Sequence, residues 1–238
     1  MIKLKTFLAA LLFAPALALA AGGVELERAP DISGDNARLQ NGARTFVHYC
    51  LACHSASALR FNRLTQIGFT EEQIKSDLLY TTDKIGNPML TALRPADGKK
   101  WFGAMPPDLS LVTRARASEA GSGADWVYTY LLTFFRDPNR PTGWNNTVFD
   151  SVGMPHVLAH LQGEQVKGAD GHLLLAKPGQ ESKEAYETTV ADLVGFLKWA
   201  GEPDAGFRKQ LGIWVLVFLA IFGVLAYKLK KEFWKDVH

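Results

Sequence analysis

Apolar residues in the middle of the chain recur mostly at three- and four-residue steps, the spacing of one face of a helix. Such steps connect five positions before residue 51, namely Leu39, Ala43, Phe46, Val47 and Cys50. A helix is therefore predicted over residues 36–50. Asp35 or Asn36 could cap it, because their side chains can accept hydrogen bonds from the first free N–H groups. The same spacing predicts an amphipathic helix over residues 184–200.

Further stretches between these two helices also favour helical structure. They are residues 62–80, 109–116, 125–135 and 157–161. In the first of them Thr70 stands three positions before Gln73, which is the arrangement of a capping box. The third is rich in aromatic residues, and aromatic residues at helical spacing usually belong to a core.

Segments rich in Gly, Pro and Asp separate the predicted helices. Residues 81–108 and 137–155 are expected to be long loops, and loops of this length usually have a function or wrap a ligand. Residues 163–179 combine alternating and turn residues and predict a small hairpin. Residues 201–204 contain Gly and Pro and end the helix before them. The expected fold class is mainly α, with long wrapping loops.

The N-terminal segment has the features of a secretory signal peptide. Lys3 and Lys5 precede an apolar run, and Ala18-Leu19-Ala20 has the form of a cleavage site. Residues 1–20 are therefore predicted to be removed, so that the mature chain begins at Ala21. An uncleaved anchor is the alternative, but the apolar run is short for the ~30 Å of a bilayer core.

A second apolar run near the C-terminus predicts a membrane anchor. Residues 211–226 carry no charge, and with their flanks they reach the ~20 residues that span a bilayer. Four lysines follow at positions 228, 230, 231 and 235. Because positive residues favour the cytoplasmic side, residues 206–230 are expected to form one transmembrane helix and residues 231–238 a cytoplasmic tail. A buried core helix is the weaker alternative.

The formal net charge of +2 conceals an acidic middle part. Residues 21–205 contain 18 Lys and Arg against 22 Asp and Glu, and the excess of positive residues lies at the two ends. An acidic domain disfavours binding to the polyanionic backbone of nucleic acid. It suits a basic protein partner by charge complementarity, although a merely solvated acidic surface explains the charge equally well.

The most specific motif in the chain is Cys50-Leu51-Ala52-Cys53-His54, the C-x-x-C-H attachment motif of a c-type haem. Two thiols at this spacing can add to the two vinyl groups of one porphyrin, and the histidine that follows can bind the iron. One such motif predicts one covalently bound haem c, and an exported protein suits this chemistry.

Other interpretations of the two cysteines are weaker. A structural zinc site needs four ligands, and the chain has only two cysteines. A redox dithiol belongs to a βαβ context, which the pattern around the motif does not show. A disulfide between Cys50 and Cys53 is the simplest structural alternative.

The sixth iron ligand is open at this point. A His/Met pair suits electron transfer, because it raises the reduction potential and fills both axial positions. Met105 and Met154 both precede proline and are about equally good candidates, whereas Met89 follows Pro88 and is less distinctive. Histidines that could serve instead are His48, His156, His160 and His172, although a surface or core role is commoner for each.

Taken in order, several segments resemble the cytochrome c1 family, the membrane-anchored haem subunits of cytochrome bc1 complexes. The resemblance runs from about residue 36 to the C-terminus, and no single segment decides it. The segments are 49–55, 63–64, 106–110, 114–116, 153–155, 196–203, 208–209 and the apolar C-terminal run. The resemblance implies a cytochrome-c-like haem domain over residues 21–205 with one C-terminal transmembrane helix.

The resemblance also implies roles for particular residues. It favours Met154 over Met105 as the sixth ligand, so that Met105 is expected to be a packing residue. The second arginine of Arg114-Ala115-Arg116 resembles the one that pairs with a haem propionate, a group that needs a charge-assisted partner when it is buried. A surface ion pair is the alternative role of Arg116.

The function that the resemblance implies is electron relay without substrate chemistry at the haem. The subunit would take one electron from the Rieske iron–sulfur protein and pass it to a soluble or tethered cytochrome c. It would do so beside cytochrome b in a dimeric ubiquinol:cytochrome c oxidoreductase of the bacterial inner membrane, with the haem domain in the periplasm.

Two other functions remain possible at this stage. The chain could be a free-standing, membrane-tethered cytochrome c that donates electrons to a terminal oxidase. It could also be an enzyme or gas sensor with an open sixth position at the iron.

Overall fold

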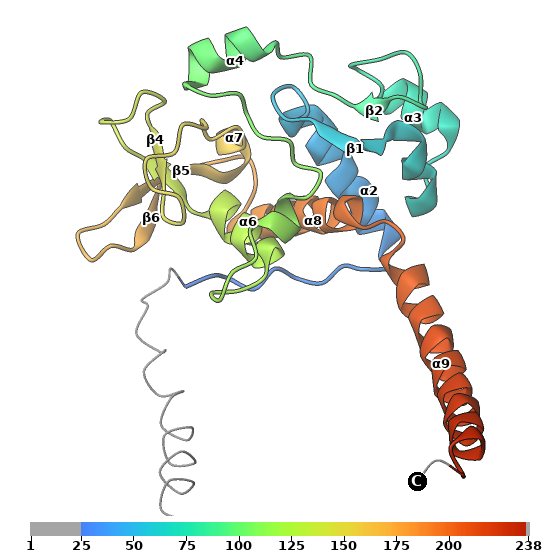
Figure 1. The fold of residues 1–238 in the computed structure, drawn as a ribbon. Helices are drawn as coiled ribbons and strands as arrows, with labels where there is room; N and C mark the ends of the chain where they lie inside the picture. Colours follow the sequence, from blue (N-terminus) through green and yellow to red (C-terminus); the bar gives the residue numbers. More distant parts are fainter. Residues whose placement is uncertain (1–24, 237–238) are drawn as a thin grey trace, which may run out of the picture.

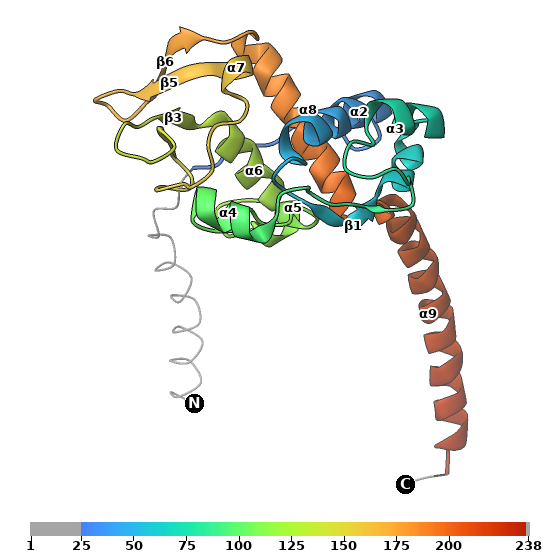
Figure 2. The same cartoon turned by 90° about the horizontal axis from the view of Figure 1, so that it is seen from above.

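The computed structural model describes residues 25–236. The described chain is mainly helical: it forms a head of short helices and two-stranded sheets (residues 25–204), from which one long helix projects (Figures 1 and 2). This confirms the expected fold class of a mainly α protein with long loops and one long C-terminal helix. The predicted signal peptide lies outside the described residues.

Two crossing helices, α2 (Asn36–Thr45) and α8 (Lys183–Gly201), form the centre of the head. All five apolar positions predicted for the first helical stretch are buried. The helices cross where Gly42 has no side chain: a Cβ atom there would lie 2.0 Å from the backbone oxygen of Asp192. The two backbones therefore approach to a distance that a larger residue at position 42 would prevent.

Contacts between side chains also stabilise the crossing of α2 and α8. The rings of Phe46 and Phe196 lie with their centroids 5.7 Å apart. The guanidinium Nε of Arg38 donates a hydrogen bond of 2.6 Å to the carboxylate of Asp192. Asp192 is buried, so this charge-assisted bond offsets the cost of removing its carboxylate from water.

The predicted helix over residues 36–50 is confirmed, but its last turn is wider than expected. Asp35 is the cap, because its side chain accepts a hydrogen bond from the N–H of Arg38. From Phe46 to Cys50 the chain forms a π-helical segment, η2, and the N–H of Leu51 donates to the carbonyl of Phe46 at 3.0 Å. Such wide turns are frequently found at functional sites.

The predicted stretch 62–80 is divided into two helices. The first is the 3-10 helix η3 (Phe61–Ile67), which ends at Gly68 with a φ of +94°. The second is α3 (Glu71–Asp77), and Thr70 and Gln73 form the predicted capping box before it. A left-handed glycine is a common end of a helix, and here it separates two helices that the periodicity alone joins.

The expectation of a continuous loop over residues 81–108 is wrong. Strand β2 (Pro88–Met89) pairs with β1 (Ala56–Arg60), and helix α4 (Pro95–Phe102) follows. Proline and glycine favoured a loop in the sequence. However, Pro95 stands in the first turn of α4, where its missing N–H costs no hydrogen bond.

The aromatic stretch 125–135 forms a helix that ends earlier than predicted. Helix α6 is Gly123–Leu132, while Phe134 and Phe135 belong to strand β3 (Phe134–Arg136). Aromatic residues suit a pleated strand as well as a helix, so their run does not locate the boundary. The helix expected over residues 109–116 is likewise reduced to α5 (Val112–Ala115).

Among the remaining elements of the head, one strand was not predicted, whereas a helix and a hairpin lie close to their predicted positions. Strand β4 (Trp144–Asn146) pairs with β3 inside the expected loop 137–155. Helix α7 (Ala159–Gln162) lies close to its predicted position. The predicted hairpin is confirmed as β5 (Gly163–Lys167) and β6 (Leu173–Pro178), which pair antiparallel.

The long C-terminal helix α9 (Ala205–Phe233) projects away from the head in both views (Figures 1 and 2). Its best 18-residue window has a mean hydropathy of 2.2, and none of that window is buried against the head. At 1.5 Å per residue it is roughly 43 Å long. Helix α9 is therefore long and apolar enough to cross a membrane, which makes it a candidate anchor.

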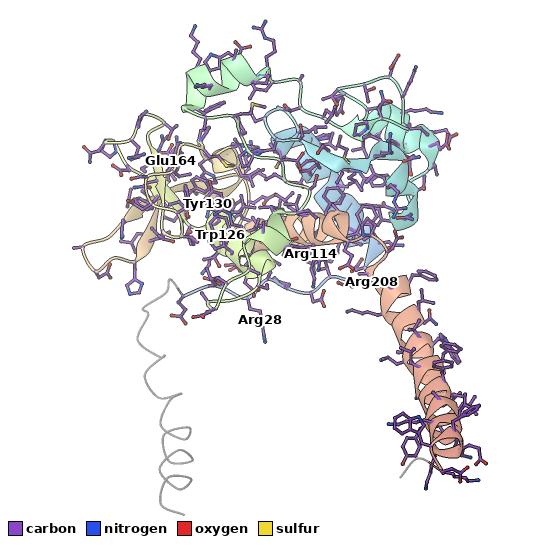
Figure 3. The ribbon with its side chains drawn as sticks, viewed as in Figure 1. Arg28, Arg114, Trp126, Tyr130, Glu164 and Arg208 are labelled. Carbon is purple, nitrogen blue, oxygen red and sulfur yellow. The ribbon has the colours of Figure 1, made fainter. Side chains whose placement is uncertain are left out.

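A set of ion pairs, here called the collar, joins the head to α9. The carboxylate of Glu202 pairs with Arg114 at 2.6 Å and also with Arg208, while Asp204 pairs with Arg63 at 2.8 Å. Arg114 and Arg208 approach the junction from the head and from α9 (Figure 3). The collar thus brings together residues from four separate segments of the resemblance.

Candidate haem site

The Cys50–His54 motif lies on the turn that follows η2. The N–H groups of Cys53 and His54 both donate to the carbonyl of Cys50, at 3.0 and 2.8 Å, and close one compact turn. Both cysteines are free thiols, so the structure contains no disulfide between them. Burial, together with the charge of the neighbouring Cys53, raises the pKa of Cys50 to about 12.

The imidazole of His54 is held in one orientation. Its Nδ1 lies 2.7 Å from the carbonyl oxygen of Pro107, and because a carbonyl can only accept, Nδ1 carries the hydrogen. This leaves the lone pair of Nε2 available for a metal. Burial lowers the pKa of His54, although the Pro107 carbonyl and Asp108 oppose that effect. The ring is therefore neutral, as an iron ligand must be.

The segment that holds His54, residues 107–110, is itself hydrogen-bonded to the residues that directly follow the Cys50–His54 motif. The carboxylate of Asp108 accepts hydrogen bonds from the N–H groups of Ser57 and Ser110, at 2.9 and 2.8 Å. The N–H of Leu109 donates to the carbonyl of Ser55 at 2.7 Å. Burial raises the pKa of Asp108, but the bonds from Ser110 and Ser57 outweigh it, and the net pKa is lowered. The Asp108 carboxylate is therefore ionised at neutral pH.

Met154 lies in a second cluster, on the loop before α7. Its side chain is half-buried and packs against Phe134, Trp144 and Val152. The hydroxyl of Tyr130 donates to its sulfur at 3.3 Å. One lone pair of the thioether is thus used, and the other is available to a metal.

The other two candidate methionines have packing roles. Met89 is completely buried in strand β2, where it pairs with Ala56. The sulfur of Met105 packs against α4, so closely that a Cβ atom added at Gly98 would lie 2.8 Å from it.

Three of the four candidate histidines have side-chain contacts within the protein, whereas His172 is exposed in the turn between β5 and β6. His48 and His160 are exposed and lie 3.5 and 3.2 Å from the hydroxyls of Tyr80 and Tyr49. His156 is buried, and its Nε2 is 2.7 Å from Oε1 of Gln162.

Arg116 lies over aromatic rings rather than beside a carboxylate. Its guanidinium carbon is 4.4 Å from the ring centre of Trp126 and 5.6 Å from that of Phe149. Among the ion pairs within residues 25–236 none involves Arg116, so the alternative of a surface ion pair is not found there. Arg116 is an exposed residue, and its guanidinium can donate hydrogen bonds to an anionic partner.

Stacked side chains connect Arg116 with Met154. The rings of Trp126 and Tyr130 are stacked on α6 with centroids 5.0 Å apart (Figure 3). Tyr130 then meets Phe134 edge-on at 5.0 Å and contacts the sulfur of Met154. The aromatic residues of this stretch were predicted to belong to the core. The hydrogen bond from the Tyr130 hydroxyl to the Met154 sulfur was not predicted.

These donors fit a c-type haem. They comprise two free thiols, an imidazole with Nε2 available and a thioether with one lone pair available. By contrast, no group of three or more His, Cys, Asp or Glu side chains within residues 25–236 could hold a metal ion by itself. The arrangement is therefore suited to an iron that arrives in a porphyrin.

Comparison with known proteins identifies relatives over almost the whole chain. Residues 30–237 match the model of the Cytochrome C1 family. "Cytochrome c1" of Allochromatium vinosum is 44% identical over 96% of both chains. "Ammonia monooxygenase gamma subunit" of Nitrosomonas europaea is 49% identical over 99% of both. Among solved structures, a chain of a "Hyperthermophilic respiratory Complex III" covers 100% of this chain, with 98% of its own length matched, at a TM-score of 0.46 and 18% identity.

Proposed function

Since the chain belongs to the cytochrome c1 family and binds one covalently attached haem c, we propose that it relays single electrons as the haem subunit of a quinol:cytochrome c oxidoreductase. A bound haem would supply one-electron redox chemistry in this role, with the Rieske iron–sulfur protein as the electron donor and a cytochrome c as the acceptor. The observation that carries the proposal is the hydrogen bond from Nδ1 of His54 to the Pro107 carbonyl, because it fixes an imidazole for permanent ligation.

Five residues of this chain hold the haem in the proposal. Cys50 and Cys53 would hold it through thioether bonds, and His54 and Met154 would ligate its iron. A haem with a His/Met pair supplies one-electron redox chemistry at a raised potential. The guanidinium of Arg116, which lies over Trp126, binds a propionate.

The proposed assembly is a membrane complex with cytochrome b and the Rieske protein, present as a dimer. Residues 1–20 direct export, residues 21–205 lie in the periplasm and residues 206–230 anchor the chain in the bacterial inner membrane. Residues 231–238 form the cytoplasmic tail. The acidic composition of residues 21–205 supports a basic cytochrome c as the acceptor.

Purification of the full chain from its native membranes through a tag placed after His238 tests the assembly. We expect b-type haem in the optical spectrum, a Rieske signal in electron paramagnetic resonance and quinol-dependent reduction of cytochrome c. Isolation of the chain alone with one c-type haem would instead support the free-standing tethered cytochrome.

The name of the Nitrosomonas europaea relative gives this experiment a further outcome. If a preparation that contains this chain oxidises ammonia and does not reduce cytochrome c with quinol, the proposed function is wrong. The 44% identical relative carries the name cytochrome c1, and the geometry around His54 supports electron relay.

Substitution of Met154 by leucine tests the ligand set. Removal of the thioether leaves the sixth position of the iron open, so the reduced haem should bind carbon monoxide and its reduction potential should fall. Met105→Leu is the matched control, because Met105 packs on α4, and it should leave both properties unchanged. If instead Met105→Leu binds carbon monoxide and has the lower reduction potential, while Met154→Leu is unchanged, Met105 is the ligand. Strong binding of carbon monoxide by the unaltered protein would favour a gas sensor.

A further inference from the structure

We propose that the hydroxyl of Tyr130 donates a hydrogen bond to the iron-bound sulfur of Met154 and thereby raises the reduction potential of the haem. The inference rests on the proposed function, specifically on Met154 as the sixth ligand. It starts from the contact of 3.3 Å between the Tyr130 hydroxyl and the Met154 sulfur. Sulfur accepts hydrogen bonds only weakly. The contact therefore persists only if the surrounding structure holds the hydroxyl in place.

The ring of Tyr130 is held on two sides. Trp126 stacks on it (Figure 3), with centroids 5.0 Å apart and an interplanar angle of 12°. Phe134 meets it edge-on, also with centroids 5.0 Å apart. The backbone is fixed as well, because the carbonyl of Tyr130 accepts a hydrogen bond of 2.7 Å from the side-chain amide of Asn146. The position of the hydroxyl therefore follows from packing and does not depend on the contact with sulfur.

The direction of the hydrogen bond is also determined. A thioether has no hydrogen to donate, so the phenol is the donor. A tyrosine hydroxyl, whose ordinary pKa is about 10, carries its hydrogen at neutral pH.

A hydrogen bond to the sulfur changes the balance between the two redox states of the iron. The bond withdraws electron density from the sulfur and makes it a weaker donor. Ferric iron gains more from a strong donor than ferrous iron does, so the hydrogen bond favours the reduced state. The apolar neighbours Phe134, Trp144 and Val152 exclude water, which strengthens this interaction.

Tyr130→Phe tests the proposal, because phenylalanine keeps the stacked ring and removes only the hydroxyl. We expect the equilibrium between reduced and oxidised haem to shift about fivefold toward the oxidised form, the usual effect of one net hydrogen bond. At ~59 mV for each factor of ten, this lowers the midpoint potential by about 40 mV. The measurement is a redox titration of the haem c band in the purified complex.

Tyr128→Phe is the matched control. Tyr128 lies on the same helix and is buried in the main core rather than beside Met154, so its hydroxyl should not affect the potential. A potential that does not fall in Tyr130→Phe, or that falls equally in Tyr128→Phe, would overturn the proposal.

The sulfur-to-iron absorption band of the oxidised protein shows whether Met154 is the ligand. It therefore distinguishes a failure of the proposed role of Tyr130 from a failure of the proposed ligand. If the unaltered protein lacks the band, Met154 is not the ligand and both proposals fail. If the band is present and Tyr130→Phe retains both the band and the original potential, only the role of Tyr130 is wrong. Loss of the band in Tyr130→Phe would also overturn that role, because the hydroxyl would then hold the ligand in place rather than tune it.

Discussion

A single carboxylate, that of Asp125, ties the N-terminal segment of the head to helix α6, 96 positions away. It accepts hydrogen bonds from the N–H of Ala29 at 2.8 Å and from the N–H and hydroxyl of Ser122 at 3.0 and 2.6 Å. Burial raises the pKa of Asp125, but these hydrogen bonds outweigh it and leave the pKa below the ordinary 3.8.

This residue predicts a dependence of stability on pH. Because the folded state lowers the pKa of Asp125, its carboxylate stabilises the fold fully above pH 3.8 and loses that effect as the pH falls through the folded-state pKa. Asp125→Asn should therefore be less stable than the unaltered protein at pH 6, and the difference should shrink toward pH 2. Free energies of unfolding measured across this range check the prediction. A difference that stays constant with pH would contradict it.

Residues whose partners lie close in the chain were predictable from the sequence. The haem motif, the cap at Asp35 or Asn36 and the capping box at Thr70 are all local patterns. The structure contains the capping box and places the cap at Asp35. The acceptor of His54 could not be predicted in this way, because Pro107 is 53 positions away. The role of the Tyr130 hydroxyl likewise depends on a loop that only the fold brings to α6.

At the scale of elements, the presence of a helix was easier to predict than its first and last residues. Helix α8 is present close to its predicted bounds, because a long amphipathic pattern with clear end signals is specific. Strand β3 was missed, since its two phenylalanines continue the aromatic pattern of α6. Helix α4 was missed because Pro95 normally ends a helix and here begins one.

The crossing of α2 and α8 gives a prediction at this scale. Gly42→Ala places a methyl group where only 2.0 Å separates the Cβ position from the backbone oxygen of Asp192. The helices must move apart, and overpacking of this kind usually costs about 1–3 kcal/mol. Thermal unfolding of the purified full chain should therefore begin at a lower temperature.

Gly206→Ala is the control for this experiment. Gly206 is also helical, but a Cβ atom there meets nothing within 4 Å. Alanine in an open helical position is neutral or slightly stabilising. If both variants unfold at the same temperature, the close crossing of α2 and α8 does not limit stability.

At the scale of the whole molecule, the collar links the head to α9. Glu202 contacts Arg114 from the head and Arg208 from α9, so one carboxylate links the two parts. Exposed ion pairs contribute only ~0–1 kcal/mol each. The collar should therefore restrict orientation without adding much to the stability of the head.

Glu202→Gln tests this function of the collar. The unfolding temperature should change little, while the distribution of distances between spin labels on α3 and on α9 should become broader. The control is Glu187→Gln, because Glu187 pairs with Lys183 within helix α8 and away from the junction. Equal distributions in the two variants would show that the ion pairs do not fix the angle of α9.

The pairing of α2 with α8 also has a consequence for the order of events in biogenesis. Arg38 and Asp192 lie 154 positions apart, so in a chain that is made from its N-terminus, α2 is complete long before the helix that packs across it. Until then Phe46 lacks the ring of Phe196, and Cys50 lacks the part of its core cluster that α8 supplies. We therefore expect thioether formation at Cys50 to precede the docking of α8.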